Sequence, residues 1–295
     1  MDVPVLRVVQ LNIGSLFEPE WERRRVEIVA WLEELRPDVV CLEEAWESPT
    51  SPNTGGWIVD ALKPPPTGTW HWRFGGGPMP FGGQEGAQFG SCVLSRWPID
   101  MFTYECLPLG PDPDQFVGGV PWELVHAQTA GLDVFATHLA AAPSHGLHRC
   151  AQVAAIDERV RSFRGGLDSL GKGRASMPAI LCGDFNAEPD SDEIRFLSSL
   201  TSLNGRTTFW QDAWRVAGDG SVGYTQDWRD NPIAASLNVH RKRIDYVFVG
   251  DPFLRPGSGG RVLEASLAFH EMRTGVMASD HRGLVVDIVW PTRPT

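Results

Sequence analysis

The sequence predicts an α/β fold, because short apolar segments of strand character alternate along the chain with segments of helical periodicity. The clearest strand is residues 177–182, an apolar run that ends abruptly at Gly183. The clearest helix is residues 20–35, in which apolar residues share one stripe while glutamates and arginines occupy the remaining surface. Alternation of this kind is typical of β-sheets that are covered by helices.

The composition predicts one globular domain with a full hydrophobic core. The chain has 295 residues, of which 42% are hydrophobic and 21% are charged. No low-complexity or linker-like segment divides it, so we expect residues 1–295 to form a single domain. The net charge of −11 disfavours a dedicated basic face for nucleic acid, although a local cationic cleft on an acidic protein can still bind phosphate.

The cysteines and the chain's start predict a location in the cytoplasm. Five cysteines are scattered along the sequence without metal-ligand spacing, so we expect free core thiols in a reducing compartment. The chain enters a strand almost at once without the pattern of a signal peptide, and no apolar run approaches the length of a membrane span. We expect a monomer.

The end of the central strand carries the residues best suited to chemistry. Asp184 and Asn186 are two residues apart, so a continuing strand would place both side chains on one face at the rim of the sheet. A carboxylate there can accept a proton from water, and an amide can donate a hydrogen bond to an oxyanion. The alternative is that Asp184 caps a helix predicted over residues 190–200.

A second strand end predicts a metal site. Residues 38–42 form an apolar run that leads directly into Glu43 and Glu44. An acidic pair at the end of a buried strand is costly unless a cation or a donor meets it. Residues 5–13 form another strand-like run, which leaves Asn12 near its C-terminal end.

Histidine and arginine residues near these motifs are candidates for binding phosphate. Residues 132–139 alternate as a strand that ends near His138, although a lone histidine there is more often a packed residue. The cluster that contains His240, Arg241 and Arg243 is the dense basic run near a motif, and it is expected to contact an anionic substrate unless it is ordinary surface charge. Residues 23–25, all arginine, are expected on the solvated face of the first helix.

Two further segments carry structural predictions. Residues 63–90 are rich in proline, glycine and aromatic residues, so they are predicted to form a long irregular loop. We hypothesise that this loop covers the active site as a lid, the alternative being an ordinary surface loop with core-facing aromatics. Residues 209–216 are predicted to be helical.

Six short blocks occur in an order that resembles the endonuclease/exonuclease/phosphatase superfamily, a group that includes DNase I. The blocks are Gln10-Leu11-Asn12, Leu42-Glu43-Glu44, Thr137-His138-Leu139, Gly183-Asp184-Phe185-Asn186, Arg243-Ile244-Asp245-Tyr246 and Ser279-Asp280-His281. Together they span nearly the whole chain. The resemblance implies a four-layer α/β sandwich, in which two mixed β-sheets pack face to face and helices flank them.

The resemblance also implies a role for each matched residue. Mg²⁺ or Mn²⁺ would bind at Glu44, assisted by Asn12 and Asp280. Glu43 stands where the family usually has glutamine, which leaves open which carboxylate binds. Asp184 would activate water, Asn186, His138 and His281 would stabilise the developing negative charge, and Asp245 would orient His281.

The implied activity is hydrolysis of a phosphodiester or a phosphomonoester. We expect a small or lipid-linked substrate, because few cations lie near the motifs and a nucleic-acid backbone must be neutralised by several. Two alternatives remain open at this point: an endo- or exonuclease that acts on DNA or RNA, and a catalytically inactive module that binds phosphate.

Overall fold

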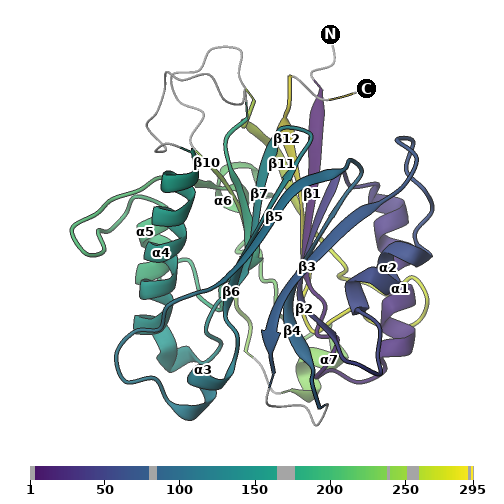
Figure 1. The fold of residues 1–295 in the computed structure, drawn as a ribbon, viewed down its shortest axis with the longest axis horizontal. Coiled ribbons are helices and arrows are strands. Elements are labelled where there is room, and N and C mark those ends of the chain that lie inside the picture. The colour runs from purple at the N-terminus through teal and green to yellow at the C-terminus, as the bar shows by residue number, and fades with distance from the viewer. Residues whose placement is uncertain are drawn as a thin grey trace.

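The computed structural model of the chain describes residues 4–79, 85–164, 177–237, 240–250, 259–291 and 294. Two six-stranded β-sheets pack face to face, and helices cover the outer face of each sheet (Figure 1). The predicted four-layer α/β sandwich is therefore confirmed. Among the described helices, none is long and apolar enough to cross a membrane.

The first sheet has the strand order β11-β12-β1-β2-β4-β3. Its strands are β1 (Val5–Asn12), β2 (Val39–Glu47), β3 (His71–Pro78), β4 (Gln88–Ser95), β11 (Val262–Ala268) and β12 (Gly283–Val289). β1 pairs with β2 in parallel, and the other neighbours pair antiparallel. Because β1 and β2 are parallel, both strands end at the same edge of the sheet.

The second sheet repeats this plan with the strand order β5-β6-β7-β8-β10-β9. Its strands are β5 (Ile99–Cys106), β6 (Glu123–Thr129), β7 (Leu132–His138), β8 (Ile180–Asp184), β9 (Trp210–Asp212) and β10 (Asp245–Gly250). β7 pairs with β8 in parallel, and β8 pairs with β10 in antiparallel register, with Asp184 opposite Asp245.

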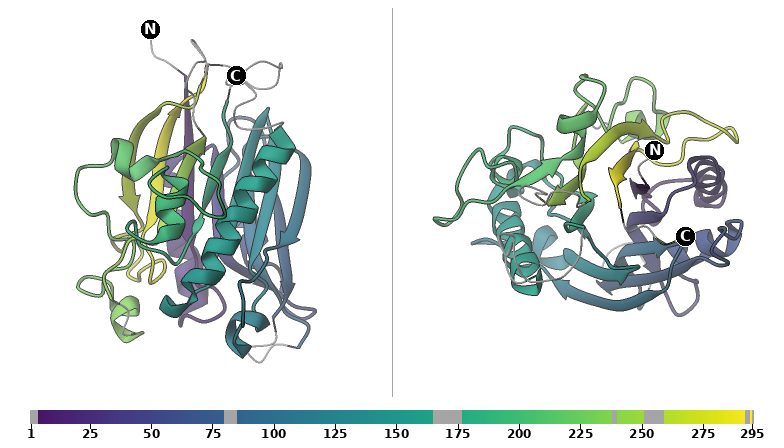
Figure 2. Two further views of the ribbon diagram at one scale, coloured as in Figure 1. Left: turned by 90° about the vertical axis from the view of Figure 1, so that its left-hand side faces the viewer. Right: turned by 90° about the horizontal axis from the view of Figure 1, so that it is seen from above.

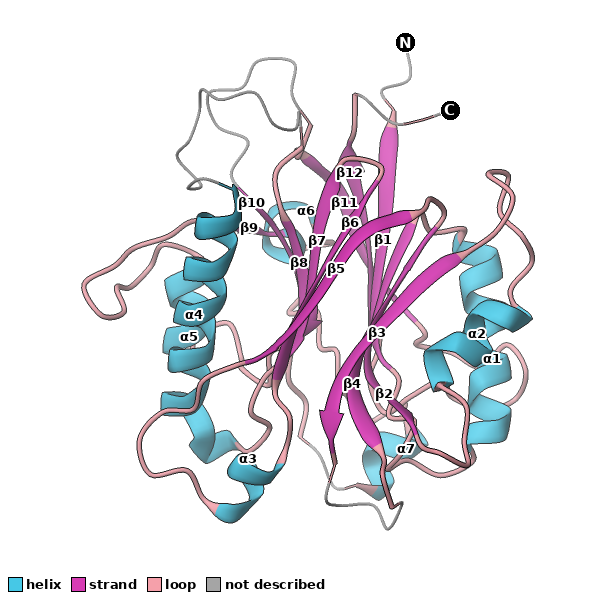
Figure 3. Ribbon diagram, viewed as in Figure 1, coloured by secondary structure: helices cyan, strands magenta, loops and turns pink. Residues whose placement is uncertain are grey.

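Helices lie outside the two sheets, as Figures 2 and 3 show from different sides. α1 (Trp21–Leu35) and α2 (Thr54–Ala61) cover the first sheet, while α4 (Gly146–Arg164) and α5 (Asp192–Leu197) cover the second. The shorter helices are α3 (Gln115–Gly119), η1 (Pro143–His145), α6 (Ala213–Ala217) and α7 (Pro232–Ser236).

The hydrophobic core lies in three layers that match this architecture. Between the sheets, side chains such as Val8, Val93, Val247 and Val286 are fully buried against one another. Separate clusters lie under the helices on each outer face. Because the central strands are buried on both faces, their sequences read as continuous apolar runs, which is why they could be recognised.

The segment predicted to be a long irregular loop contains a regular strand, so the prediction of an irregular loop is wrong, while the hypothesis that the segment covers the site as a lid stays a hypothesis. Residues 71–78 form β3, which pairs with β4 over its full length. Its glycines permit close packing: a Cβ atom at Gly76 would lie 2.7 Å from the carbonyl oxygen of Phe89. Residues 63–66 border a cavity together with Arg7 and Arg36. Arg7 lies in the N-terminal half of β1 and Asn12 ends that strand, so residues 63–66 lie toward the other end of β1 from Asn12. Residues 80–84 lie outside the described residues.

Three local predictions also need correction. Residues 209–216 contain strand β9 before the short helix α6, and the helix predicted over residues 190–200 spans only Asp192–Leu197. Arg24 is fully buried and does not lie on a solvated face. Helical periodicity could not reveal this, because its guanidinium binds backbone carbonyl groups of distant loops.

We predict that Gly183→Ala destabilises the fold. Gly183 has a φ of 156°, and a Cβ atom there would lie 2.0 Å from the carbonyl oxygen of Thr137 on the neighbouring strand. The resulting overpacking should lower the free energy of unfolding by about 1–3 kcal/mol beyond the backbone strain. Urea denaturation measures the loss.

The matched control is Gly205→Ala. Gly205 also has a positive φ, 71°, but a Cβ atom there would meet nothing within 4 Å. This substitution should cost only the backbone strain, about 1–2 kcal/mol. Equal losses at the two positions would contradict the packing argument.

Candidate active site

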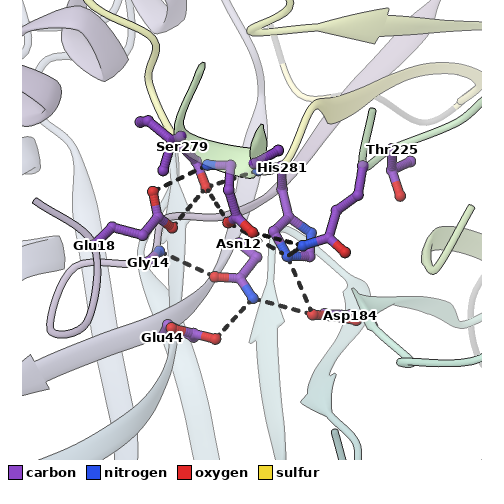
Figure 4. Close-up of polar contacts among 12 residues, drawn as sticks. Asn12, Gly14, Glu18, Glu44, Asp184, Thr225, Ser279 and His281 are labelled. Atoms are coloured by element: carbon purple, nitrogen blue, oxygen red, sulfur yellow. Dashed lines mark hydrogen bonds and ion pairs between the residues drawn. The ribbon is translucent and has the colours of Figure 1, made fainter. Parts of the chain in front are cut away.

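Asp184 belongs to a buried polar cluster where β1 and β8 end (Figure 4). Its Oδ2 atom accepts a hydrogen bond of 3.1 Å from Asn12 Nδ2, so the two sheets meet at this contact. The same oxygen lies 3.6 Å from His138 Nε2 and 3.8 Å from His281 Nε2. One carboxylate oxygen is therefore surrounded by an amide and two imidazoles.

Asn186 lies beside Asp184, although the reason differs from the one predicted. β8 ends at Asp184, and Asn186 turns back with a left-handed φ of 49°. Its backbone N–H donates to Asp184 Oδ1 at 2.8 Å, and its Nδ2 atom lies 3.1 Å from His138 Nε2. The capping alternative for Asp184 is wrong, because the N-cap residue of α5 is Ser191.

His281 forms a close pair with the buried carboxylate of Asp245. His281 Nδ1 lies 2.8 Å from Asp245 Oδ2, and the other oxygen of Asp245 accepts a hydrogen bond of 2.9 Å from Gln10 Nε2. Thr225 Oγ1 accepts the backbone N–H of Asp245 at 3.3 Å. These contacts hold the orientation of the Asp245 carboxylate, which in turn orients the imidazole.

The two histidines lie in environments that shift their pKa values in opposite directions. Burial alone would lower the pKa of His281, but the carboxylates of Asp245, Asp280 and Asp184 raise it well above its usual value. Burial lowers the pKa of His138 in spite of Asp184. At neutral pH the cluster therefore holds one imidazolium, His281, and one neutral imidazole, His138.

Gln226 connects His281 to Asp280. Its Nε2 atom donates to Asp280 Oδ2 at 2.6 Å and lies 2.8 Å from His281 Nε2. This orientation of the Gln226 amide suits a His281 Nε2 atom that carries no proton. When His281 is protonated, the amide must turn its oxygen, which has no hydrogen-bond partner among the described residues, toward Nε2.

The pKa of Asp184 is raised by burial and by the neighbouring charge of Asp245, while His281 and His138 oppose that shift. A buried carboxylate with a raised pKa is a better proton acceptor than an exposed one. Asp184 therefore has the environment expected of a general base.

A β-bulge decides which carboxylate of the Glu43–Glu44 pair faces the cluster. The pairing of β2 with β4 shifts between Leu42 and Ala45, and Glu44 has a positive φ of 58°. Glu43 is directed to Gln10, whose Nε2 atom donates to it at 2.7 Å. Glu44 instead accepts a hydrogen bond of 3.1 Å from Asn12 Nδ2, and burial raises its pKa to about 7.

The donor groups of this cluster fit a divalent cation. Ligand atoms of Asp184, Asp245 and His281 all lie within 4.8 Å of one another. The Nδ1 atom of His281 is already paired with Asp245, however, and a protonated imidazole is not a ligand. The carboxylates of Glu44 and Asp280, whose charges act on each other, offer hard oxygen atoms, which is the donor type that Mg²⁺ and Mn²⁺ prefer.

The structure corrects the expectation for Arg243. This residue is buried, and its guanidinium forms two hydrogen bonds with Asp212, of 2.8 and 3.1 Å. It is therefore a structural residue and not a surface contact for substrate. Arg241 is bound to Asp227 at 2.9 Å but remains partly exposed, and His240 is exposed, so both stay candidates for binding an anion.

Several residues of the cluster were missed in the sequence. They are Gln10, Glu18, Arg24, Thr225 and Gln226. Gln10 is part of a recognised block, but nothing in its local pattern indicated that it binds Asp245. The other four lie outside the blocks, in segments whose polarity resembles that of ordinary loops or helix surface.

The fold and this cluster together define the architecture of the metal-dependent phosphoesterases. The model of the Endonuclease/Exonuclease/phosphatase family matches residues 9–281, so the chain belongs to this family. The resemblance seen in the sequence is thereby confirmed.

Named relatives agree with this family membership. The chain is 27% identical to Nocturnin from Xenopus laevis over 160 residues, which cover 54% of this chain and 37% of Nocturnin. The human Nocturnin catalytic domain with bound sulfate has a similar fold, with a TM-score of 0.66, 21% identity, and coverage of 97% of this chain and 93% of that one.

A second solved structure with a similar fold is D. rerio TDP2 complexed with single-strand DNA product. It has a TM-score of 0.69 and 18% identity, and the match covers 96% of this chain and 98% of that one. At these identities, the structural comparisons establish the fold.

We predict that Arg243→Met destabilises the protein. The substitution leaves the buried carboxylate of Asp212 without its cation, which should lower the free energy of unfolding by roughly 3–5 kcal/mol. Chemical denaturation measures this loss. Arg241→Met, at a partly exposed position, should cost clearly less, and a stable Arg243→Met protein with only a raised KM would restore the substrate-binding role.

We also predict that Asp245→Asn lowers the pKa of His281. The charge of Asp245 is the largest influence that raises this pKa, so its removal leaves burial to dominate. NMR titration of the imidazole protons reports the change. Asp133→Asn, which removes the carboxylate beside His126, should leave the His281 titration unaltered. An unchanged His281 pKa in Asp245→Asn would show that the pair is not coupled.

Proposed function

We propose that the protein is a divalent-cation-dependent phosphoesterase that hydrolyses a phosphodiester or a phosphomonoester. The observation that carries this proposal is the position of Asp184 Oδ2, between the amide of Asn12 and the imidazoles of His138 and His281. Charge of both signs is concentrated there in a buried site, where electrostatic stabilisation of a transition state is strongest.

The side chains divide the work of hydrolysis among them. Asp184, held by the backbone N–H of Asn186, orients a water molecule and accepts its proton. The imidazolium of His281, maintained by Asp245, stabilises the negative charge that develops on the phosphoryl group. Asn186 and the neutral His138 complete the polar surface on the opposite side of Asp184.

The carboxylates of Glu44 and Asp280 would hold the cation, with Asn12 in contact with Glu44. We propose Mg²⁺ or Mn²⁺, which would polarise a phosphoryl oxygen when bound. The Oδ1 atom of Asn12 already accepts a hydrogen bond of 3.0 Å from Gly14 N, and its Nδ2 atom donates to Glu44 and Asp184. The first role of Asn12 is therefore to hold these two carboxylates together.

For the substrate we propose a small or lipid-linked phosphoester. Within the described residues, the basic cluster offers few cations that a substrate could reach. Arg243 is buried, and Arg241 is already paired with Asp227. An extended nucleic-acid backbone needs several free cations along its path, and the net charge of −11 opposes its approach.

A second candidate is cleavage of single-stranded nucleic acid. Phe17 is half exposed and packs edge-on against Phe89 at 5.6 Å, and Phe89 lies 6.4 Å from His138. An exposed aromatic ring near a phosphate site can stack on a base. The D. rerio TDP2 structure with single-strand DNA product also supports this candidate.

We further infer that residues 1–295 act as one monomeric domain in the cytoplasm. Both sheets contribute side chains to the same polar cluster, which supports a single functional unit. All five cysteines are free thiols, which supports a reducing compartment.

The experiment is a substrate panel with the purified protein in Mg²⁺, Mn²⁺ or excess EDTA. The panel contains bis-p-nitrophenyl phosphate, p-nitrophenyl phosphate, sphingomyelin, inositol phosphates, single-stranded oligonucleotides and supercoiled plasmid. We predict cation-dependent turnover that is lost in EDTA, and a fall in kcat of roughly 10²-fold or more in Asp184→Asn.

Each outcome decides between the candidates. Faster turnover of small or lipid-linked esters supports the first candidate, and faster cleavage of oligonucleotides supports the second. Full activity in EDTA, or an unchanged kcat in a folded Asp184→Asn protein, would overturn the proposed mechanism. No turnover of any substrate would favour an inactive phosphate-binding module.

A further inference from the structure

Glu18 is a buried carboxylate in the segment between β1 and α1, and it contacts the strand end that carries Asp280 and His281. Its Oε2 atom accepts the backbone N–H of Asp280 at 3.0 Å, and its Oε1 atom accepts the hydroxyl of Ser279 at 3.2 Å (Figure 4). Ser279 Oγ in turn accepts the backbone N–H of His281 at 3.1 Å. Glu18 therefore contacts Ser279 and Asp280 directly, and His281 through Ser279, in the loop before β12.

Arg24 supports Glu18 from the opposite side. Its guanidinium has no exposed surface, and Nη1 lies 3.4 Å from Glu18 Oε2. The same nitrogen donates to the carbonyl oxygens of Ile13, at 2.8 Å, and Ala278, at 2.9 Å. Arg24 thus ties the segment after Asn12 to the segment before Asp280.

The backbone at Gly14 leaves room for the Glu18 carboxylate. Gly14 has a positive φ of 52°, and a Cβ atom built on it would lie 1.4 Å from Glu18 Oε1. The carboxylate of Glu18 therefore occupies the space that a side chain at position 14, two residues after Asn12, would otherwise fill. The Glu18 carboxylate can therefore take this position only because residue 14 is glycine.

The charges around Glu18 point to a cation. Glu18 accepts the backbone N–H of Asp280, and the charges of Asp280 and Glu44 both act on the Glu18 carboxyl group. Arg24 opposes these three carboxylates directly at Glu18. Buried carboxylates in contact repel one another unless a proton or a cation is shared between them. A divalent cation held by Asp280 and Glu44 would relieve that repulsion.

We propose that Glu18 is a positioning residue for the cation site: it holds Asp280 in place and adds negative charge that strengthens cation binding. The proposal rests on the proposed function, because it concerns the same cation. Glu18 acts through Asp280 and the loop it fixes, in the way that partners of metal ligands commonly tune affinity.

The test measures Mn²⁺ binding directly, by isothermal titration calorimetry and by electron paramagnetic resonance of the free ion, without any substrate. The variants are Glu18→Gln, which keeps the shape and removes the charge, and Glu18→Asp, which keeps the charge. The matched control is Glu20→Gln, because Glu20 is exposed and paired with Arg23.

We predict that Glu18→Gln raises the Kd for Mn²⁺ by about 10-fold or more, as loss of a ligand's partner commonly does. Glu18→Asp should recover part of the affinity, and Glu20→Gln should match the unchanged protein. Thermal unfolding in EDTA provides the second readout. Glu18→Gln should keep most of the cation-free Tm while losing the increase in Tm that Mn²⁺ produces.

Other outcomes overturn the proposal in distinguishable ways. A folded Glu18→Gln protein that binds Mn²⁺ as the unchanged protein does would remove the role of Glu18 and leave the proposed function intact. The same conclusion follows if Glu18→Gln unfolds and Glu18→Asp lowers the cation-free Tm without changing the Kd. Absence of Mn²⁺ binding in the unchanged protein would overturn both this proposal and the cation in the proposed function.

Discussion

The arrangement of the site depends on the amide of Asn12, which donates to Glu44 in its own sheet and to Asp184 in the other sheet, each at 3.1 Å. Two carboxylates at the ends of two sheets would repel one another if they met without a donor between them. The amide supplies that donor, because β1 and β8 end at the same level of the sandwich. The same amide therefore joins the two sheets and positions the two carboxylates of the site.

The same cluster separates charge between two histidines that look alike in the sequence. His281 has Asp245 at 2.8 Å, with Asp184 and Asp280 nearby, and these carboxylates keep it protonated. His138 lies 3.6 Å from Asp184 but is buried against an amide and two aromatic rings, Trp122 at 5.4 Å and Phe89 at 6.4 Å, and this burial lowers its pKa. Asp184, between them, faces an imidazolium on one side and a neutral ring on the other, a polarity suited to a phosphoryl group.

Buried ion pairs serve two purposes in this fold. Arg243 and Asp212 brace the end of β9 and the start of α6. Arg24 and Glu18 instead connect the segment after β1 with the loop that carries Asp280. Both arginines were expected at the surface, since arginine seldom lies in a core. Their burial is tolerated because carboxylate or carbonyl oxygens satisfy each guanidinium.

The apolar runs of the sequence predicted the α/β class and the central strands, because a strand that is buried on both faces is apolar along its length. The residues of the six blocks came from the resemblance to the family. Tertiary structure decided the rest. The bulge that aims Glu44 and Glu43 in different directions depends on β4, and the regularity of β3 depends on glycines that let neighbouring backbone approach. The contacts of Glu18, Arg24 and Gln226 join residues far apart in the chain, and no local pattern encodes a partner that only folding brings near.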